Sequence, residues 1–222
     1  MSAAGGSSSE CHKLVIGLVG GIGSGKSRIA EGFEGLGAHV ISGDRLGHEA
    51  LRQPATIKQI VTRWGREVLD EHGEVNRREL GKKVFADPKE LRELEKLVFP
   101  HIQRRIREEI ESAQEMPGIR YVVLDAAVML EAGWDAECDY VVFVHAPKDV
   151  RMERLARERG WTIEDLEARE RAQLPLAEKL SRVDFVLENS GSTQEMTEQI
   201  EELLRQMSLV SGHARMGMTR QE

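Results

Sequence analysis

The chain has 222 residues, of which 40% are hydrophobic, and its 31 basic and 38 acidic residues give a net charge of −7. This length suits one domain with an inserted subdomain, and the acidic balance argues against nucleic acid or an anionic membrane as the main partner. No apolar run approaches the roughly 20 residues that a membrane span needs.

The chain start and the cysteines indicate a cellular compartment. Residues 1–12 are small and polar and lack the basic start and apolar block of a signal peptide, so we expect a disordered tail there. Cys11 and Cys138 show no metal-binding spacing, and we expect both to be free thiols in a reducing compartment. Together these features predict a cytoplasmic protein.

The first predicted elements alternate between strand and helix. Residues 13–20 (KLVIGLVG) form a short apolar run that ends in glycines, which is typical of a buried strand. A helix is expected over 26–36, where Gly37 ends it, and a second strand over 38–42.

The segment 54–116 differs in character, because it is charged and mostly helical in period. Its apolar stripe is interrupted by Pro100, and it contains no convincing strand. We therefore expect an inserted helical subdomain.

Three further apolar runs, at 119–126, 139–146 and 184–189, are typical of parallel strands covered on both faces. Between them, residues 148–182 form a charged helical stretch. A last helix is expected over 192–207, followed by a flexible tail over 209–222. The alternation predicts a three-layer α/β fold with a parallel sheet, whose core comprises 13–53 and 117–208.

Residues 20–27 (GGIGSGKS) fit the phosphate-loop pattern G-x-x-x-x-G-K-[ST] between a predicted strand and a predicted helix. Glycines let backbone N–H groups converge on one anion, and the helix N-terminus adds positive potential. The alternative is a glycine-rich turn with an incidental lysine. We expect a nucleotide to be bound by Gly21, Ile22, Gly23, Ser24, Gly25, Lys26, Ser27 and Arg28.

The end of this loop and the later strands together indicate which nucleotide is used. Lys26 offers a compact charge to the β- and γ-phosphates, and Ser27 can offer its hydroxyl to Mg²⁺. No N-K-x-D motif for guanine follows a later strand, since Asn189 precedes Ser-Gly. This favours ATP and a kinase. Arg28 must either turn to solvent or meet the phosphates as a cation.

Acceptor chemistry is expected where strands end on the loop side. Asp44 follows the second strand and could be either a general base or a helix N-cap. Asp125 ends the third strand and could be a Mg²⁺-side acid or a turn residue. The arginines between 151 and 171 could close over phosphates, although such a run is usually a solvated helix face. His101 is more typical of a surface or helix-packing residue.

The motifs, taken in order, resemble the dephospho-coenzyme A kinase family over about residues 13–207. The resemblance rests on separate segments: LVGGIGSGKS, SGDRLGHEAL, WGREVLDEHGEVNRREL, VFAD with LEKLVFPHI, LDAAVMLEAG, and ARERAQLPLAEKLSRVDFVLENSG. The phosphate loop alone is shared with many families, whereas the ordered set is specific.

The resemblance implies phosphorylation of the 3′-hydroxyl of dephospho-coenzyme A with ATP and Mg²⁺. It implies that Lys26, Asp44 and Arg154 are catalytic and that Ser27 and Asp125 lie at the metal. It places the acceptor near Asp44, Arg77 and Glu131, and the adenine near the loop from Asn189 to Gly191. It also implies that the helical insertion over 54–116 helps to hold the coenzyme-A-type substrate.

The chain also departs from the family pattern. Ser42 and Gly43 replace the Asp-Ala of the family's D-A-D segment, so one carboxylate is missing near the acceptor. Arg28 stands where Thr is common, and Phe99 replaces a histidine. Ala127 and Met129 alter the P-L-L segment. Glu158 replaces the second arginine of the family's helical lid, which corresponds to about residues 148–182 here.

Two other functions remain open from the sequence. A kinase for a nucleoside or another small metabolite would keep the chemistry and change the acceptor. A nucleotide-binding scaffold that has lost catalysis would fit the missing carboxylate and the change at Phe99.

Overall fold

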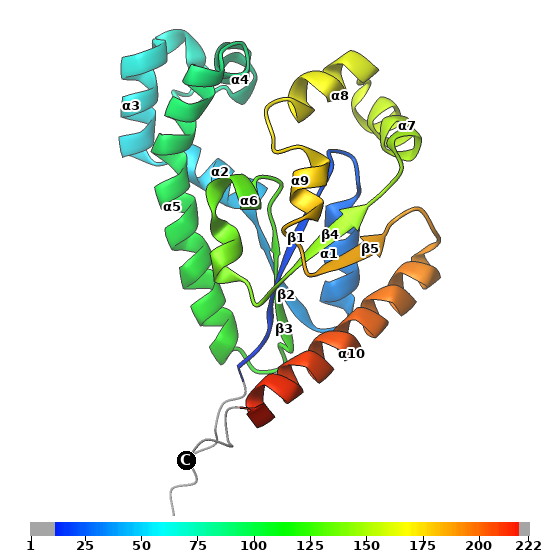
Figure 1. Cartoon of the computed structure of the whole chain (residues 1–222). Coiled ribbons are helices and arrows are strands. Elements are labelled where there is room, and N and C mark those ends of the chain that lie inside the picture. Colours follow the sequence, from blue (N-terminus) through cyan, green and yellow to red (C-terminus); the bar gives the residue numbers. More distant parts are fainter. Residues whose placement is uncertain (1–11, 218–222) are drawn as a thin grey trace, which may run out of the picture.

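The computed structural model describes residues 12–217, with side chains described as far as residue 210. Five parallel strands form one sheet in the order β2-β3-β1-β4-β5 (Figure 1). Each strand falls within a segment that the apolar runs predict: β1 (Val15–Gly20), β2 (Ala38–Ser42), β3 (Tyr121–Asp125), β4 (Tyr140–His145) and β5 (Phe185–Glu188).

Helices cover both faces of the sheet, because alternate strand residues point to opposite sides. Ile16, Leu18 and Val142 belong to a buried cluster with residues of α1 (Lys26–Gly35) and α10 (Thr193–Gly217). On the other face, Val122 and Phe143 pack with residues of α2 (Gly43–Leu51), α5 (Pro88–Glu115), α6 (Met129–Ala132) and the short helix η2 (Trp134–Glu137). The predicted three-layer α/β fold is confirmed.

The long helix α5 runs without a break through Pro100, although the sequence suggested an interruption there. A proline inside a helix removes one backbone hydrogen bond at a cost of about 3 kcal/mol. Val98, Ile102 and Ile106 are buried on either side of it. Burial of this stripe is what favours the unbroken helix, because tertiary packing supplies most helical stability.

Within 54–116, the remaining helices are α3 (Pro54–Trp64), η1 (Arg66–Val68) and α4 (Arg77–Val84). They share a small cluster of their own, formed by Ile60, Trp64, Val68, Leu80 and Val84. One isolated antiparallel bridge joins Leu69 to Val75. The segment is thus helical and carries a separate small core.

The charged stretch from residue 148 to 182 contains α7 (Lys148–Arg159), α8 (Ile163–Glu170) and α9 (Leu176–Leu180). In Figure 1, α3 and α4 stand on one side above the carboxyl ends of the strands, and α7 and α8 stand on the other. The edge of the sheet where ligands bind in open α/β folds therefore lies between two helical arms.

The chain ends differ in part from expectation. α10 continues to Gly217, ten residues past the expected end at Met207, so much of the predicted flexible tail is helical. The extension contains no proline, and each of its two glycines costs only about 1 kcal/mol relative to alanine in a helix. Residues 1–11 and 218–222, which carry the rest of the predicted tails, lie outside the described residues.

Two further expectations concern the thiols and membranes. Cys138 is a free cysteine, and burial raises the pKa of its thiol to about 12, whereas Cys11 lies outside the described residues.

None of the helices in the described part of the chain is long and apolar enough to cross a bilayer.

Candidate active site at the phosphate loop

The phosphate loop connects β1 to α1 and depends on glycines at two positions. Gly23 and Gly25 have φ of +76° and +82°, in the left-handed region that side chains disfavour. A Cβ at Gly25 would lie 2.3 Å from Nδ2 of Asn189 and 3.2 Å from Nη1 of Arg154. Gly25 is the N-cap of α1, and no side chain caps this helix. The first-turn N–H groups are therefore left to bind an anion.

Lys26 lies where several charges converge. Its burial lowers the pKa of the ammonium, the charges of Asp125, Asp44 and Glu131 raise it, and the charge of Lys179 lowers it. The hydroxyl of Ser27 donates a hydrogen bond of 3.0 Å to Oδ2 of Asp125. The structure thus brings together four residues that the sequence predicted separately: Lys26, Ser27, Asp44 and Asp125.

The turn from β2 into α2 places Asp44. The hydroxyl of Ser42 accepts a hydrogen bond from the backbone N–H of Arg45, so Ser42 is the N-cap. The cap interpretation of Asp44 is therefore wrong, and its carboxylate is exposed on the first turn of α2. A Cβ at Gly43 would lie 2.8 Å from Cβ of Ala126, so glycine allows α2 to start close to the end of β3.

Arg154 and Asn189 support the loop. Arg154 donates hydrogen bonds to the carbonyls of Ser24 (3.2 Å) and Asn189 (2.7 Å). The side chain of Asn189, only 1% exposed, donates to the carbonyls of Ser24 (2.7 Å) and Gly25 (3.3 Å). The amide of Asn189 thus supports the loop, while Gly191 is exposed at the start of the connection to α10. Their contact with a nucleotide stays a prediction.

The side chain of Arg28 is half-buried and hydrogen-bonded, and its contact with a phosphate stays a prediction. Its Nη2 donates to Oγ1 of Thr193 at 3.0 Å, and its Nη1 contacts Oδ1 of Asn189 at 3.5 Å. The guanidinium therefore lies between the first turn of α1 and the first residue of α10.

Lys179 is a buried residue whose role the sequence did not reveal. Its ammonium is fully buried and contacts Oε1 of Glu131 (2.9 Å), Oε1 of Gln173 (3.0 Å) and the carbonyl of Ala127 (3.1 Å). Oε1 of Glu131 also accepts the N–H of Leu174 at 2.9 Å. These contacts join α9 to the turn after β3. Lys179 lies in the segment ARERAQLPLAEKLSRVDFVLENSG, which resembles the family, and this resemblance was the one sequence signal that could have drawn attention to it.

Arg151 is a second residue whose role the sequence missed. It is 4% exposed, and its Nη1 donates to the carbonyl of Ile22 (3.0 Å) and to Glu170 (2.6 Å). The solvated-face interpretation of this arginine run is wrong for Arg151 and Arg154 and right for the exposed Arg157. Residues three apart on a helix lie on the same face, so the sequence spacing could have indicated that Arg151 faces the loop together with Arg154.

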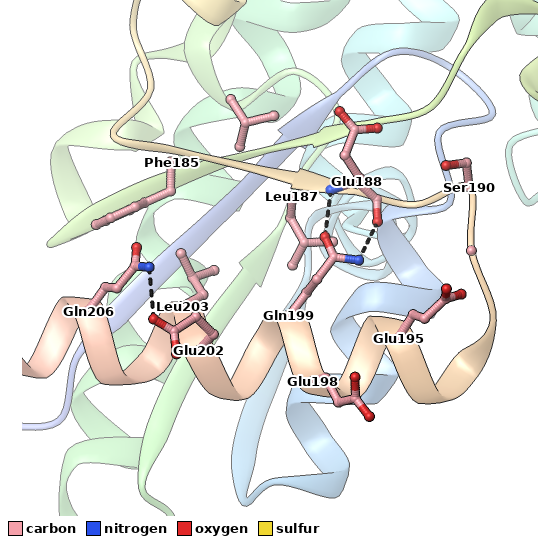
Figure 2. Close-up of a pocket in the computed structure, with 12 residues that line it drawn as sticks. Phe185, Leu187, Glu188, Ser190, Glu195, Glu198, Gln199, Glu202, Leu203 and Gln206 are labelled. Carbon is pink, nitrogen blue, oxygen red and sulfur yellow. Dashed lines mark hydrogen bonds between the residues drawn. The ribbon is translucent and has the colours of Figure 1, made fainter.

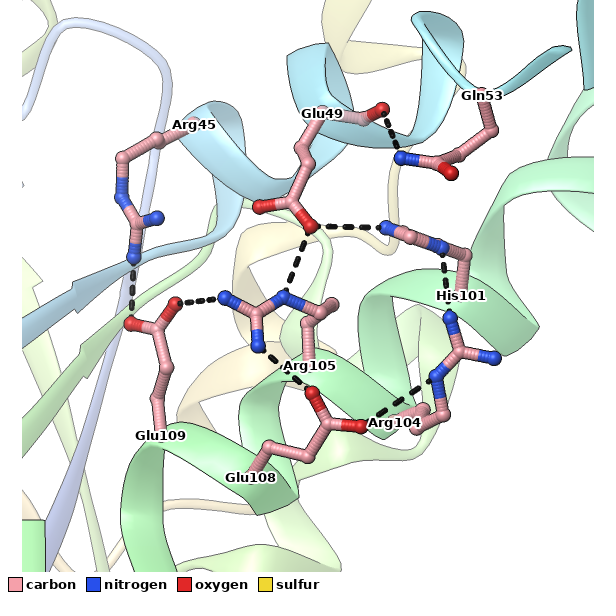
Figure 3. A network of polar contacts seen from close by, with 8 residues as sticks. All are labelled: Arg45, Glu49, Gln53, His101, Arg104, Arg105, Glu108 and Glu109. Carbon is pink, nitrogen blue, oxygen red and sulfur yellow. Dashed lines mark hydrogen bonds and ion pairs between the residues drawn. The ribbon is translucent and has the colours of Figure 1, made fainter. Parts of the chain in front are cut away.

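A network of charged residues joins α2 to α5 (Figure 3). Oε1 of Glu49 accepts from Nε of Arg105 at 2.8 Å and lies 3.2 Å from Nε2 of His101, and Arg45 pairs with Glu109. His101 is therefore a helix-packing residue, as expected. These contacts fix the helix that carries Asp44 against the long helix of the insertion.

Phe99, which stands where the family pattern has a histidine, packs edge-to-face on Trp134 with ring centroids 5.1 Å apart. The substitution places an aromatic ring in the apolar cluster between α5 and the sheet. The replacement of histidine by Phe99 therefore changes the packing between α5 and η2.

A cleft of about 990 Å³ lies between α4 and α5 on one side and α8 on the other. One carboxylate, Glu95, lines it, and burial raises the pKa of this group. Its cationic lining consists of Arg77, Arg78, Lys82, Arg92, Arg169 and Arg171. The charge of this cleft suits a ligand with several phosphates.

A groove of about 610 Å³ between β5 and α10 has the opposite charge (Figure 2). Its walls carry Glu188, Glu195, Glu198 and Glu202. Like-charge repulsion makes this groove unsuited to phosphates, whereas the phosphate loop and the cationic cleft both favour an anion.

The family model and the curated relatives agree on one family. The family model for dephospho-CoA kinase matches residues 14–195. The chain is 38% identical to the dephospho-CoA kinase of Syntrophotalea carbinolica over 87% of the chain and 92% of that protein. It is 40% identical to that of Anaeromyxobacter dehalogenans over 86% and 90%. The crystal structure of TT1252 from Thermus thermophilus superposes with a TM-score of 0.74 and 34% identity, over 89% of this chain and 98% of that one.

We expect Gly25→Ala to reduce ATP affinity by at least tenfold, because the new Cβ would collide with Asn189 in a left-handed backbone conformation. Titration calorimetry with ATP measures this. Gly35→Ala is the matched control: Gly35 also lies at an end of α1, and a Cβ there meets nothing within 4 Å. Equal ATP affinity in the two variants would contradict the packing role of Gly25.

We expect Lys179→Met to lower the free energy of unfolding by about 3–5 kcal/mol, because it leaves the Glu131 carboxylate buried without its partner. The double variant Lys179→Met with Glu131→Gln should recover most of the loss. Urea unfolding of the three proteins measures both effects. A loss below about 1 kcal/mol in the single variant would show that this pair does not stabilise the fold.

Proposed function

We propose that this chain, which belongs to the dephospho-CoA kinase family, transfers the γ-phosphoryl group of ATP to the 3′-hydroxyl of dephospho-coenzyme A. The products are coenzyme A and ADP. One structural observation supports this proposal beyond family membership. The carboxyl ends of neighbouring strands bring together Lys26, Ser27, Asp44 and Asp125. This set combines a phosphate cradle with a carboxylate for an acceptor, which transfer to a hydroxyl requires.

On the nucleotide side, the free N–H groups at the start of α1 bind the phosphates, and Lys26 contacts the β- and γ-phosphates. The lowered pKa of Lys26 has burial as its largest cause, so an arriving phosphate also stabilises the charged ammonium. Arg154, already hydrogen-bonded to the loop, adds positive charge from α7.

The oxygen atoms at the loop fit Mg²⁺. The hydroxyl of Ser27 and the carboxylate of Asp125 are hard donors 3.0 Å apart, and Mg²⁺ is commonly held by one or two protein oxygens together with substrate phosphates. Within residues 12–217, no group of three or more His, Cys, Asp or Glu forms a separate metal site. Bound Mg²⁺ would neutralise charge on the transferring phosphoryl group.

On the acceptor side, Asp44 orients the 3′-hydroxyl and accepts its proton as the oxygen attacks the γ-phosphorus and ADP leaves. Its carboxylate is exposed on the first turn of α2 and close enough to Lys26 to raise the pKa of the ammonium. Because Ser42 stands where the family pattern has the first Asp of its D-A-D segment, Asp44 performs this role without that neighbouring carboxylate.

The cationic cleft between α4, α5 and α8 supports the choice of acceptor. Dephospho-coenzyme A carries a diphosphate group, and Arg77 and Arg78 of α4 face this cleft together with Arg169 and Arg171 of the charged stretch 148–182. We assign the acceptor diphosphate to it. Glu131 is engaged by Lys179 and Leu174, so we assign it a positioning role at the acceptor side.

The surviving catalytic set argues against a scaffold that has lost activity, and the family membership favours dephospho-coenzyme A over other acceptors. A cytoplasmic location stays a prediction from the sequence.

The purified chain should consume one ATP for each dephospho-coenzyme A converted, in the presence of Mg²⁺. A coupled ADP assay with chromatographic detection of coenzyme A measures this ratio. Turnover of a nucleoside or sugar with no turnover of dephospho-coenzyme A would replace the proposed acceptor.

Asp44→Asn should lower kcat by about 10²–10⁴-fold, because the hydroxyl proton loses its acceptor. The Kd of ATP should change by less than about threefold, since Asp44 lies on the acceptor side of Lys26. Glu34→Gln on the exposed face of α1 is the control and should behave like the unmodified chain. An unchanged kcat in Asp44→Asn would remove Asp44 from the mechanism.

A further inference from the structure

The C-terminal end of α8 faces two different sites. Arg169 and Arg171 line the cationic cleft to which we assign the acceptor diphosphate. Glu170 lies between them in the sequence and lines a smaller pocket of about 370 Å³ with Gly21 and Arg151, beside the phosphate loop. Neighbouring residues on a helix point in different directions, so this one turn lies between the two predicted ligand sites.

Arg151 extends this connection from α8 to the backbone of the loop. Its Nη1 donates to Oε1 of Glu170 at 2.6 Å and to the carbonyl of Ile22 at 3.0 Å. The described chain contains no cis peptide bond, so the N–H of Gly23 points the opposite way from the carbonyl of Ile22, away from Arg151. The contact thus fixes the orientation of one peptide group in the segment that binds phosphate.

The position of Arg151 depends on α8. Its side chain is 4% exposed, and Glu170 is the carboxylate that pairs with it among the described residues. Without Glu170 the buried guanidinium would lose its counter-charge, which is strongly unfavourable. Arg151 therefore keeps its place against Ile22 while α8 keeps Glu170 beside it.

The helix α8 itself is weakly anchored. Of its eight residues, all of them described, only Leu166 is buried, and an element with few buried apolar contacts opens at a low cost in free energy. In the empty cleft, the arginines at the end of α8 face Arg77 and Arg78 of α4, and these like charges repel each other. An anionic acceptor between the two walls replaces this repulsion by attraction and favours the arrangement in which α8 is seated.

We infer that Arg151 and Glu170 are positioning residues that couple the two sites, so that an acceptor in the cationic cleft strengthens nucleotide binding at the phosphate loop. The inference rests on the proposed acceptor and nucleotide. The acceptor seats α8, the seated helix places Glu170 on Arg151, and Arg151 holds the peptide between Ile22 and Gly23. By linkage, the nucleotide strengthens acceptor binding by the same factor. Arg151 lies outside the segments that carry the family resemblance, so this pair is not part of that pattern.

The test measures the Kd of a non-hydrolysable ATP analogue with Mg²⁺ by titration calorimetry, first without acceptor and then with saturating dephospho-coenzyme A. The ratio of the two Kd values is the coupling factor. Glu170→Gln removes the charge and keeps a hydrogen-bond acceptor for Arg151. The matched control is Glu167→Gln, one turn earlier on α8, whose carboxylate pairs at 2.9 Å with the exposed Lys148 of α7.

We expect a coupling factor of at least about fivefold in the unmodified chain and in Glu167→Gln, and a factor below about twofold in Glu170→Gln. The double variant Arg151→Gln with Glu170→Gln leaves no buried unpaired charge, so it should fold and still show a factor below about twofold. The melting temperature of each unliganded variant is recorded, because a merely structural role of the pair would lower it and leave the coupling factor unchanged.

A coupling factor of about fivefold or more in both Glu170→Gln and the double variant would overturn the inference, as would a factor near one in the unmodified chain. An equal loss of coupling in Glu167→Gln would overturn it as well, because the seating of α8 alone would then carry the effect. The proposed function fails separately: it falls if dephospho-coenzyme A is not turned over, whereas full turnover with a coupling factor near one overturns this inference alone.

Discussion

The shape of the phosphate loop depends on the buried amide of Asn189. This one side chain donates to two consecutive carbonyls, those of Ser24 and Gly25, at the point where β1 gives way to α1. Each carbonyl has one further donor, Arg154 for Ser24 and the N–H of Ile29 for Gly25, so Asn189 completes the pairing of both carbonyls in a buried turn. Once they are turned toward Asn189, the N–H groups that follow are directed to the opposite side, where a phosphate can bind. Gly25 is required because any side chain there would occupy the place of the Asn189 amide.

The helices around the loop are attached to it by two buried cations, Arg151 and Lys179. Arg151 binds the carbonyl of Ile22 while paired with Glu170, and Lys179 connects α9 to Glu131 after β3. A buried ion pair contributes little net stability, but it strongly disfavours arrangements in which either charge loses its partner. The buried pairs therefore specify how the segment from α7 to α9 is seated over the loop more than they stabilise the fold.

Several departures from the family pattern are explained by contacts elsewhere in the fold. Ser42 caps α2 with its hydroxyl, and Gly43 allows the helix to start against Ala126. Phe99 packs on Trp134, and His101 joins the α2–α5 network through Glu49. These substitutions leave the carboxylate of Asp44 in place on an exposed first turn of its helix. Glu158, in contrast, forms an ion pair with the neighbouring exposed Arg157, and nothing in the structure explains the presence of this glutamate.

Local patterns in the sequence were sufficient to predict the five strands, the phosphate loop and the three-layer fold, because burial on both faces and glycine spacing are local requirements. The resemblance to a family supplied the acceptor and the expected roles of Asp44 and Asp125. Only the tertiary structure could decide the partners of Arg28, Arg151 and Lys179, because a charged residue on a helix reads the same whether it faces water or a buried carbonyl. The unbroken path of α5 through Pro100 was decided there as well, since the packing that offsets a lost hydrogen bond comes from residues distant in the chain.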